Sequence, residues 1–284
     1  MAMACHRFWL CLLGLGLVAC APSTGAHKED GMRDDGTTQV VTSGGLRFDD
    51  APVEARIGRH TYRIPAHYFY DQMGPTFQGD VSLRLQWPDL TPMPPGRTRE
   101  SSFLERMAAV SYAIYYVDRL DIRESMRRGY SNAAMPKDTL DYRDPENRLD
   151  LRIPQPEAMG LIRYDLDPVL DADYARAWEA ENGRPVKIRP GWRKDWYIAH
   201  DEMGEVVTFI KCDTDEISDG LIVRGRELLD NENPQDRRVA RCAHFMILPE
   251  ERLSVRISYV RVLLPEWNRI EGALKDILAR TRLD

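Results

Sequence analysis

The chain has 284 residues and lacks several features that would mark particular classes of protein. Its formal net charge is −6, so it has no basic excess with which a general nucleic-acid binder neutralises phosphates. It contains no Gly-x-Ser-x-Gly, no Gly-Lys-Ser/Thr phosphate loop and no His-Glu-x-x-His. Hydrophobic residues make up 43% and charged residues 30%, which is typical of a globular protein of one large or two small domains.

Lysine is scarce, because only six of the 39 basic residues are lysine and the rest are arginine. Arginine favours bidentate contacts with carboxylates, although a GC-rich genome gives the same bias. With 45 acidic residues in the chain, we expect most arginines to find surface partners that each contribute little to stability.

The N-terminus has the pattern of a secretory signal. A short basic start ending at Arg7 precedes about a dozen apolar residues, and small residues follow. The apolar run is shorter than the about 20 residues that a transmembrane helix needs. We therefore predict that residues 1–19 are a signal peptide that is removed on export.

The end of the run, Leu17 to Cys20, resembles a bacterial lipobox. The resemblance implies diacylglycerol on the sulfur of Cys20, cleavage before that residue and acylation of the new amine, as by palmitate. Ala21 follows in place of aspartate, which resembles an outer-membrane sorting pattern. The anchored protein would then face the periplasm. Residues 20–45 are rich in Gly, Ser, Thr and charge, and predict a flexible linker with a reach of roughly 28 Å.

Cysteine is also scarce, with five in the chain. Two of them leave with the signal and Cys20 is used by lipid, so Cys212 and Cys242 remain. Two thiols in an oxidising compartment predict one disulfide, worth about 3.5 kcal/mol in the chain-entropy model. The spacing suits neither zinc nor a thioredoxin-like site, so we predict no metal and no cofactor.

The folded part, residues 46–284, predicts one α+β domain in which hairpins build antiparallel sheet. Strands are expected at 57–64 and 81–87, and 107–117 suits either a strand or a helix with a preference for strand. Two hairpins are expected, 196–200 with 206–212 and 242–248 with 253–260. Residues 119–168 predict short elements and loops, residues 213–241 mostly loop, and residues 172–181 a short helix. An amphipathic C-terminal helix begins near Pro265 and packs on the sheet through an apolar stripe of Trp267, Ile270, Leu274, Ile277 and Leu278.

Two histidines and two acidic clusters are the candidates for chemistry. His200 stands beside Asp201 and Glu202 on an expected tight turn, and His244 alternates with Cys242 on a strand, where we expect a half-buried side chain. The acidic clusters could be considered as calcium sites, but neither has the ligand order of an EF-hand loop. A solvated acidic surface is therefore the simpler interpretation. They are Asp165, Asp167, Asp171 and Asp173, and Asp213, Asp215, Glu216 and Asp219.

The second acidic cluster has another interpretation, because it lies between the two cysteines and arginines follow it. A loop of both charge signs that is pinned by a disulfide is a candidate partner-binding surface. A plain polar loop remains the alternative. The candidate binding residues are Asp213, Asp215, Glu216, Asp219, Arg224, Arg226, Arg237 and Arg238.

Four short stretches resemble a loosely defined group of proteobacterial envelope lipoproteins, some of which serve as periplasmic immunity partners of antibacterial toxins. The stretches are 62–68, 85–92, 242–245 and 264–271. The resemblance implies a binding protein of the immunity type with a protein partner, and it offers no agreed active site to carry over to this chain. Two alternatives stay open. One is an envelope hydrolase that uses His200 or His244, and the other is a structural lipoprotein of an envelope assembly.

Overall fold

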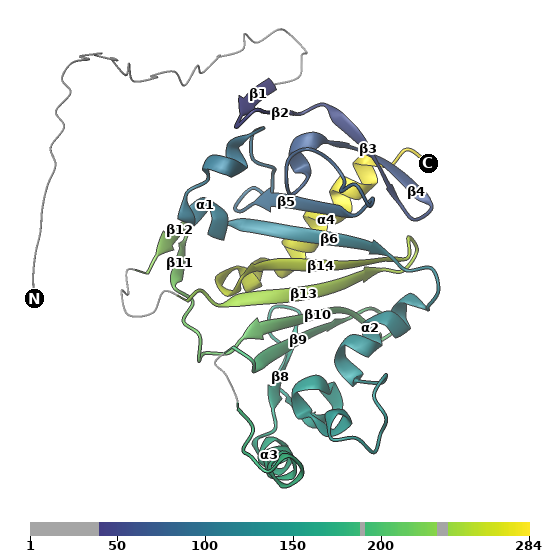
Figure 1. Cartoon of the computed structure of the whole chain (residues 1–284), viewed down its shortest axis with the longest axis vertical. Helices are drawn as coiled ribbons and strands as arrows, with labels where there is room; N and C mark the ends of the chain where they lie inside the picture. Colours follow the sequence, from purple (N-terminus) through teal and green to yellow (C-terminus); the bar gives the residue numbers. More distant parts are fainter. Residues whose placement is uncertain (1–39, 188–190, 232–237) are drawn as a thin grey trace, which may run out of the picture. The chain divides into compact units, whose positions relative to one another are not determined.

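The computed structural model describes residues 40–187, 191–231 and 238–284 (Figure 1). The predicted signal peptide, Cys20, most of the predicted linker and Arg237 lie outside the described residues. Within them, no helix is long and apolar enough to cross a membrane. The α-helices are α1 Phe103–Met107, α2 Ile122–Ser131, α3 Pro168–Asn182 and α4 Trp267–Thr281. The strands are β1 Val40–Ser43, β2 Leu46–Asp49, β3 Pro52–Ile57, β4 His60–Pro65, β5 Val81–Gln86, β6 Ala109–Tyr116, β7 Arg152–Pro154, β8 Ile162–Leu166, β9 Lys194–His200, β10 Val206–Asp213, β11 Leu221–Arg224, β12 Glu227–Asp230, β13 Arg241–Leu248 and β14 Leu253–Val260.

One eight-stranded sheet organises the described residues. Its strand order is β5-β6-β14-β13-β10-β9-β8-β7, and neighbouring strands are antiparallel. Three further two-stranded hairpins, β1–β2, β3–β4 and β11–β12, surround it. Together with α4 this confirms the predicted α+β class with antiparallel sheet and a C-terminal helix.

Helix α4 covers one face of the sheet, and Figure 1 shows it passing behind β6 and β14. Alternate residues of the strands point toward it, such as Leu83 and Ile257, which are both fully buried. The apolar stripe of α4 meets them through Ile270 and Leu274. Each such side chain stabilises the fold by about 1.5–3 kcal/mol, so this layer is the main core.

Helix α2 covers part of the opposite face. Its Ile122 and Met126 pack on Trp196 and Phe209 of β9 and β10. The sequence predicted short elements and loops here without placing this helix, because it has few apolar positions. Its start is instead set by Asp121, whose carboxylate accepts hydrogen bonds from the backbone N–H of Arg123 and Glu124.

The two predicted hairpins are confirmed as β9–β10 and β13–β14. The ambiguous segment 107–117 is a strand, β6, as preferred. Its helical pattern had a real source, because α1 lies immediately before it. Helix α1 begins with a capping box in which Ser102 and Glu105 satisfy each other's backbone N–H groups.

Two predictions, the strand at 57–64 and the loop at 213–241, were wrong for the same reason. In each segment a glycine forms a tight turn between two strands. The expected strand 57–64 is the end of β3, a turn and β4, because Gly58 has φ +62 and reverses the chain. The expected loop 213–241 contains the hairpin β11–β12, which turns at Gly225 with φ +61. In each turn a Gly-Arg pair links two strands, and glycine takes the first turn position, where φ must be positive.

Helix α3 ends at Gly183, as the sequence predicted, but begins four residues before the expected start. The side chain of Asp167 caps it, and Pro168 occupies the first turn, where its missing N–H is harmless. Strand β1 occupies residues that the sequence assigned to the linker and pairs with β2.

Candidate interaction site

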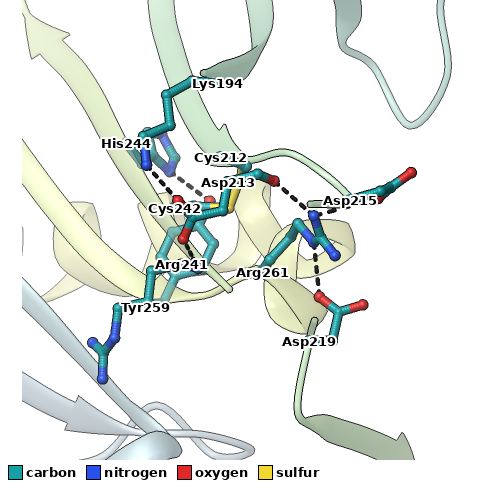
Figure 2. The surroundings of a disulfide bond; sticks show 10 residues. All are labelled: Lys194, Cys212, Asp213, Asp215, Asp219, Arg241, Cys242, His244, Tyr259 and Arg261. Carbon is teal, nitrogen blue, oxygen red and sulfur yellow. Dashed lines mark hydrogen bonds and ion pairs between the residues drawn. A yellow bond between two sulfur atoms is a disulfide. The ribbon is translucent and has the colours of Figure 1, made fainter. Parts of the chain in front are cut away.

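The disulfide predicted from the cysteine count is present in the structure. Cys212 of β10 and Cys242 of β13 face each other directly across the sheet, with their Cα atoms 4.0 Å apart (Figure 2). Both side chains are buried on the face that α4 covers. The disulfide closes residues 213–241 into a loop, which we call the bridged loop.

A single arginine outside the bridged loop holds its first turn. Arg261 follows β14, and its Nε donates to Asp219 Oδ1 at 2.7 Å. The same guanidinium donates to the backbone oxygens of Asp213, at 2.7 Å, and Ile217, at 3.2 Å, and forms an ion pair with Asp215 at 3.4 Å. Figure 2 shows the loop curving around this side chain. The planar guanidinium supplies several fixed donors at once, so the turn is ordered by more than the disulfide.

The structure describes seven of the eight predicted binding residues, all but Arg237, and separates them into two groups. Asp213 pairs with Lys194 and accepts a hydrogen bond from the backbone N–H of Arg241, and Asp219 pairs with Arg261, so both hold the fold, whereas Asp215 pairs with Arg261 from an exposed position. Glu216, Arg224, Arg226 and Arg238 are exposed. Arg226 forms an exposed ion pair with Asp89. The acidic part of the bridged loop therefore serves the fold, and the β11–β12 tip presents its arginines to solvent.

His244 is fully buried, which corrects the prediction of a half-buried residue. Its Nε2 lies 2.9 Å from Glu271 Oε1 of α4, and its Nδ1 lies 3.2 Å from the Tyr259 hydroxyl. Thr208 donates to the same Glu271 oxygen at 2.6 Å, and Lys275 reaches the other at 3.1 Å. Burial raises the pKa of Glu271, but the hydrogen bond and charge of His244 outweigh burial and leave the pKa below its usual value. This network joins α4 to the sheet.

The other candidates for chemistry are local structural groups. Asp201 accepts hydrogen bonds from the backbone N–H of Met203 and Glu205 in the β9–β10 turn, and His200 beside it is exposed. In the first acidic cluster, Asp167 caps α3 and Asp171 pairs with Arg193. Among the residues that the structure describes, no three His, Cys, Asp or Glu side chains are placed to hold a metal ion.

A charged cluster that the sequence did not indicate lies near α2. The side chain of Arg152 is fully buried, 3.0 Å from Glu146, and its Nη1 donates to the backbone oxygens of Tyr164 and Lys194. Burial raises the pKa of Glu146 to about 7, against the opposing charge of Arg152. Burial also lowers the pKa of Lys211 to about 8, and its Nζ lies 4.3 Å from the centre of the Trp196 ring. Because the side chain of Arg152 is buried and out of reach of a ligand, we interpret this cluster as structural. It attaches residues 145–152 to the sheet.

Arg152 and Arg261 were missed because a single arginine among 33 gives no local signal. Each is defined by backbone oxygens that come from distant segments. The sequence can show that arginine is abundant, but only the tertiary structure shows which arginine meets carbonyl groups and which stays in solvent.

No protein-family model matches the chain, and no curated protein matches it significantly. A solved structure does match, that of Smlt3025, an immunity protein of the Stenotrophomonas maltophilia type IV secretion system. The two structures superpose with a TM-score of 0.78 at 33% sequence identity, and the match covers 87% of this chain and 100% of that one. With this identity over the full length of the neighbour, the chain belongs to the same family as the immunity protein Smlt3025.

Proposed function

We propose that this protein is an immunity protein that binds a secreted antibacterial toxin and neutralises it. The observation that carries the proposal is the relationship to Smlt3025 over that protein's full length, since Smlt3025 is an immunity protein of a type IV secretion system. The fold is consistent with a binding role. Its buried polar groups make structural contacts that hold segments together, which leaves the surface features for contact with a partner. Its exposed features are charged loops and a sheet face of the kind that a partner can contact.

The N-terminal sequence supports a location for this role. We propose that Cys20 carries a lipid anchor, and that the domain stands on the periplasmic side of the outer membrane. A secreted toxin would then meet its immunity partner in the periplasm, before it reaches its target.

The test is protection in living cells. Susceptible bacteria would express the toxin encoded next to this gene, exported to the periplasm, with or without the full-length protein. We expect survival only when both are present, and a complex of the two on co-purification. Cell death in both cultures, together with no complex, would refute the immunity role.

A matched control separates the role from its location. The Cys20→Ala variant keeps the export signal and the folded domain but loses the proposed lipid site. If this variant still binds the toxin in solution, any loss of protection is due to its location and not to binding.

A further inference from the structure

One part of the sheet is uncovered on the face opposite α4. Alternate residues of β5, β6 and β14 point to this side, and α2 packs farther along, on β9, β10 and β13, with a smaller contact to β14. In Figure 1 no helix passes in front of β6 and β14. We call this surface the open face. Its residues are Ser82, Arg84, Gln86, Ser111, Ala113, Tyr115, Ser254, Arg256 and Ser258.

The open face is hollow because many of its side chains are small. Ser82, Ser111, Ala113 and Ser258 line a cavity of about 400 Å³. The loop between Phe69 and Val81 forms one wall of this cavity, with Tyr70 at its start. A hollow of this size accepts one or two side chains of a partner, and its floor is made of rigid strands.

Large exposed apolar side chains lie on the lining of the hollow, at Tyr70 and Tyr115, and on the wall loop, at Met73 and Phe77. Phe77, at the tip of the wall loop, has an exposed fraction of 108%, so its ring touches almost nothing in the protein. Tyr70, Met73 and Tyr115 are each about half exposed. Aromatic residues, methionine and arginine are the types enriched at protein interfaces, where a few of them supply most of the binding energy. A fully exposed Phe on a loop is costly in water and gains its value when a partner covers it.

The strands of the open face carry positive charge only. Arg84 lies over the Tyr70 ring at 3.7 Å, and Arg256 lies over the Phe245 ring at 5.8 Å. Within the described residues neither guanidinium has a carboxylate partner, and the Nε of Arg84 is buried without a hydrogen bond. Asp71 and Asp80 of the wall loop also line the hollow, together with Arg256, and Asp71 accepts a hydrogen bond from the backbone N–H of Met73. The aromatic rings hold the two guanidiniums in place, ready for a carboxylate.

We propose that the open face is the toxin-docking surface and that it receives an acidic segment of the toxin. Arg84 and Arg256 lie on strands separated by β6 and are opposite Ser111 and Ala113, two residues apart, so their backbones are about 12 Å apart, and the segment must present carboxylates at a similar spacing. Phe77 and Tyr115 bind the apolar side chains next to those carboxylates. This inference rests on the proposed immunity function.

A second copy of this chain fits the open face poorly. In a two-fold dimer the same surface meets itself, so the strands of the second copy would bring two more arginines and no carboxylate to Arg84 and Arg256. Like charges in contact oppose association. The acidic part of the bridged loop is a weaker candidate for the toxin contact, because Arg261 and Lys194 already pair with its aspartates.

The test compares two double charge reversals with equal change in net charge. The first is Arg84→Glu with Arg256→Glu on the open face, and the matched control is Arg224→Glu with Arg226→Glu at the β11–β12 tip. Calorimetry would measure the binding of the purified toxin that is encoded next to this gene. Thermal unfolding would show whether each variant is folded. We expect the first variant to bind at least 100-fold more weakly, and the control to bind within about threefold of the wild type.

Phe77→Ser is a third variant that cannot disturb the core, because the ring is fully exposed. We expect it to bind about tenfold more weakly with an unchanged unfolding temperature. If the wild type binds no toxin, the immunity function and the docking surface both fail. If the wild type binds and only the β11–β12 variant is impaired, the docking surface alone fails. It also fails if the open-face reversal changes self-association but leaves toxin binding intact.

Discussion

At the scale of single residues, arginine is the group that attaches irregular segments to this sheet. Arg261 donates to the backbone oxygens of Asp213 and Ile217, and Arg252 donates to those of Asp118 and Leu120. Arg152 does the same for the segment before β7. A guanidinium has five N–H donors in a fixed plane, so it can satisfy several carbonyl groups together, which a lysine ammonium does less well.

Gly58 is a position where both conformation and space require glycine. Its φ is +62, and a Cβ there would overlap the ring of Tyr116. Gly225 has nearly the same φ, +61, with open space around it. We expect Gly225→Ala to lower the free energy of unfolding by about 1–2 kcal/mol and Gly58→Ala by at least about 2 kcal/mol more. Urea unfolding of the two variants measures these losses in free energy of unfolding. Equal losses in the two variants would contradict the expected clash between the new Cβ at position 58 and the Tyr116 ring.

Glu271 makes stability depend on acid pH. Its pKa is below the usual 4.5 in the folded protein, mainly because the His244 contact outweighs burial. The unfolded chain therefore takes up the proton first as the pH falls. The stabilisation is complete above about pH 4.5 and is lost as the pH drops through the folded pKa.

The matching variant is Glu271→Gln. We expect it to lower the free energy of unfolding at pH 7 by about 2–4 kcal/mol, because the buried His244 and Thr208 lose a charged partner. The deficit should shrink below pH 4.5, where the wild type loses the same advantage. Urea unfolding at pH 7 and pH 3.5 measures this, with Glu202→Gln at the exposed β9–β10 turn as control. A deficit that is constant with pH would contradict the assignment.

At the scale of elements, the disulfide fastens the two central hairpins to each other. Strands β10 and β13 are neighbours in the sheet although the 29-residue bridged loop separates their cysteines, since the sequence separation is 30. Cross-linking restricts the unfolded chain more than the folded one.

We expect Cys212→Ala with Cys242→Ala to lower the free energy of unfolding by about 3 kcal/mol while the fold is kept. Arg261 would still hold the first turn of the bridged loop. Chemical denaturation measures the loss, and wild-type protein in a strong reductant is the control and should match the variant. If oxidised wild type and variant unfold at the same denaturant concentration, the disulfide contributes no net stability.

At the scale of the whole molecule, the proposed lipid anchor sets where the domain works. Several acyl chains hold a protein at a membrane far better than one, because each buried CH₂ adds about 0.8 kcal/mol. We expect full-length wild type to fractionate with membranes and to incorporate labelled palmitate. Cys20→Ala should be found outside the membrane fraction and carry no label, whereas a labelled Cys20→Ala would place the acylation elsewhere.

The sequence by itself determined the local features. The alternation in residues 81–86 and 253–260, the stripe of α4 and the two cysteines each have a short-range signal, because strand and helix periods are fixed by the backbone. The sequence also indicated the immunity-type resemblance. It missed α2, because that helix has few apolar positions. It also missed both Gly-Arg turns, one inside an expected strand and the other inside an expected loop.

Only the tertiary structure decided which strands are neighbours and which face stays uncovered. Strand β6 lies between β5 and β14, about 140 residues farther along the chain, and this pairing creates the open face. Serines that look like ordinary outward residues become the floor of a hollow, and Arg84 and Arg256 come to share one surface. The physical reason is that strand order and side-chain partners depend on long-range packing, on which a local pattern carries no information.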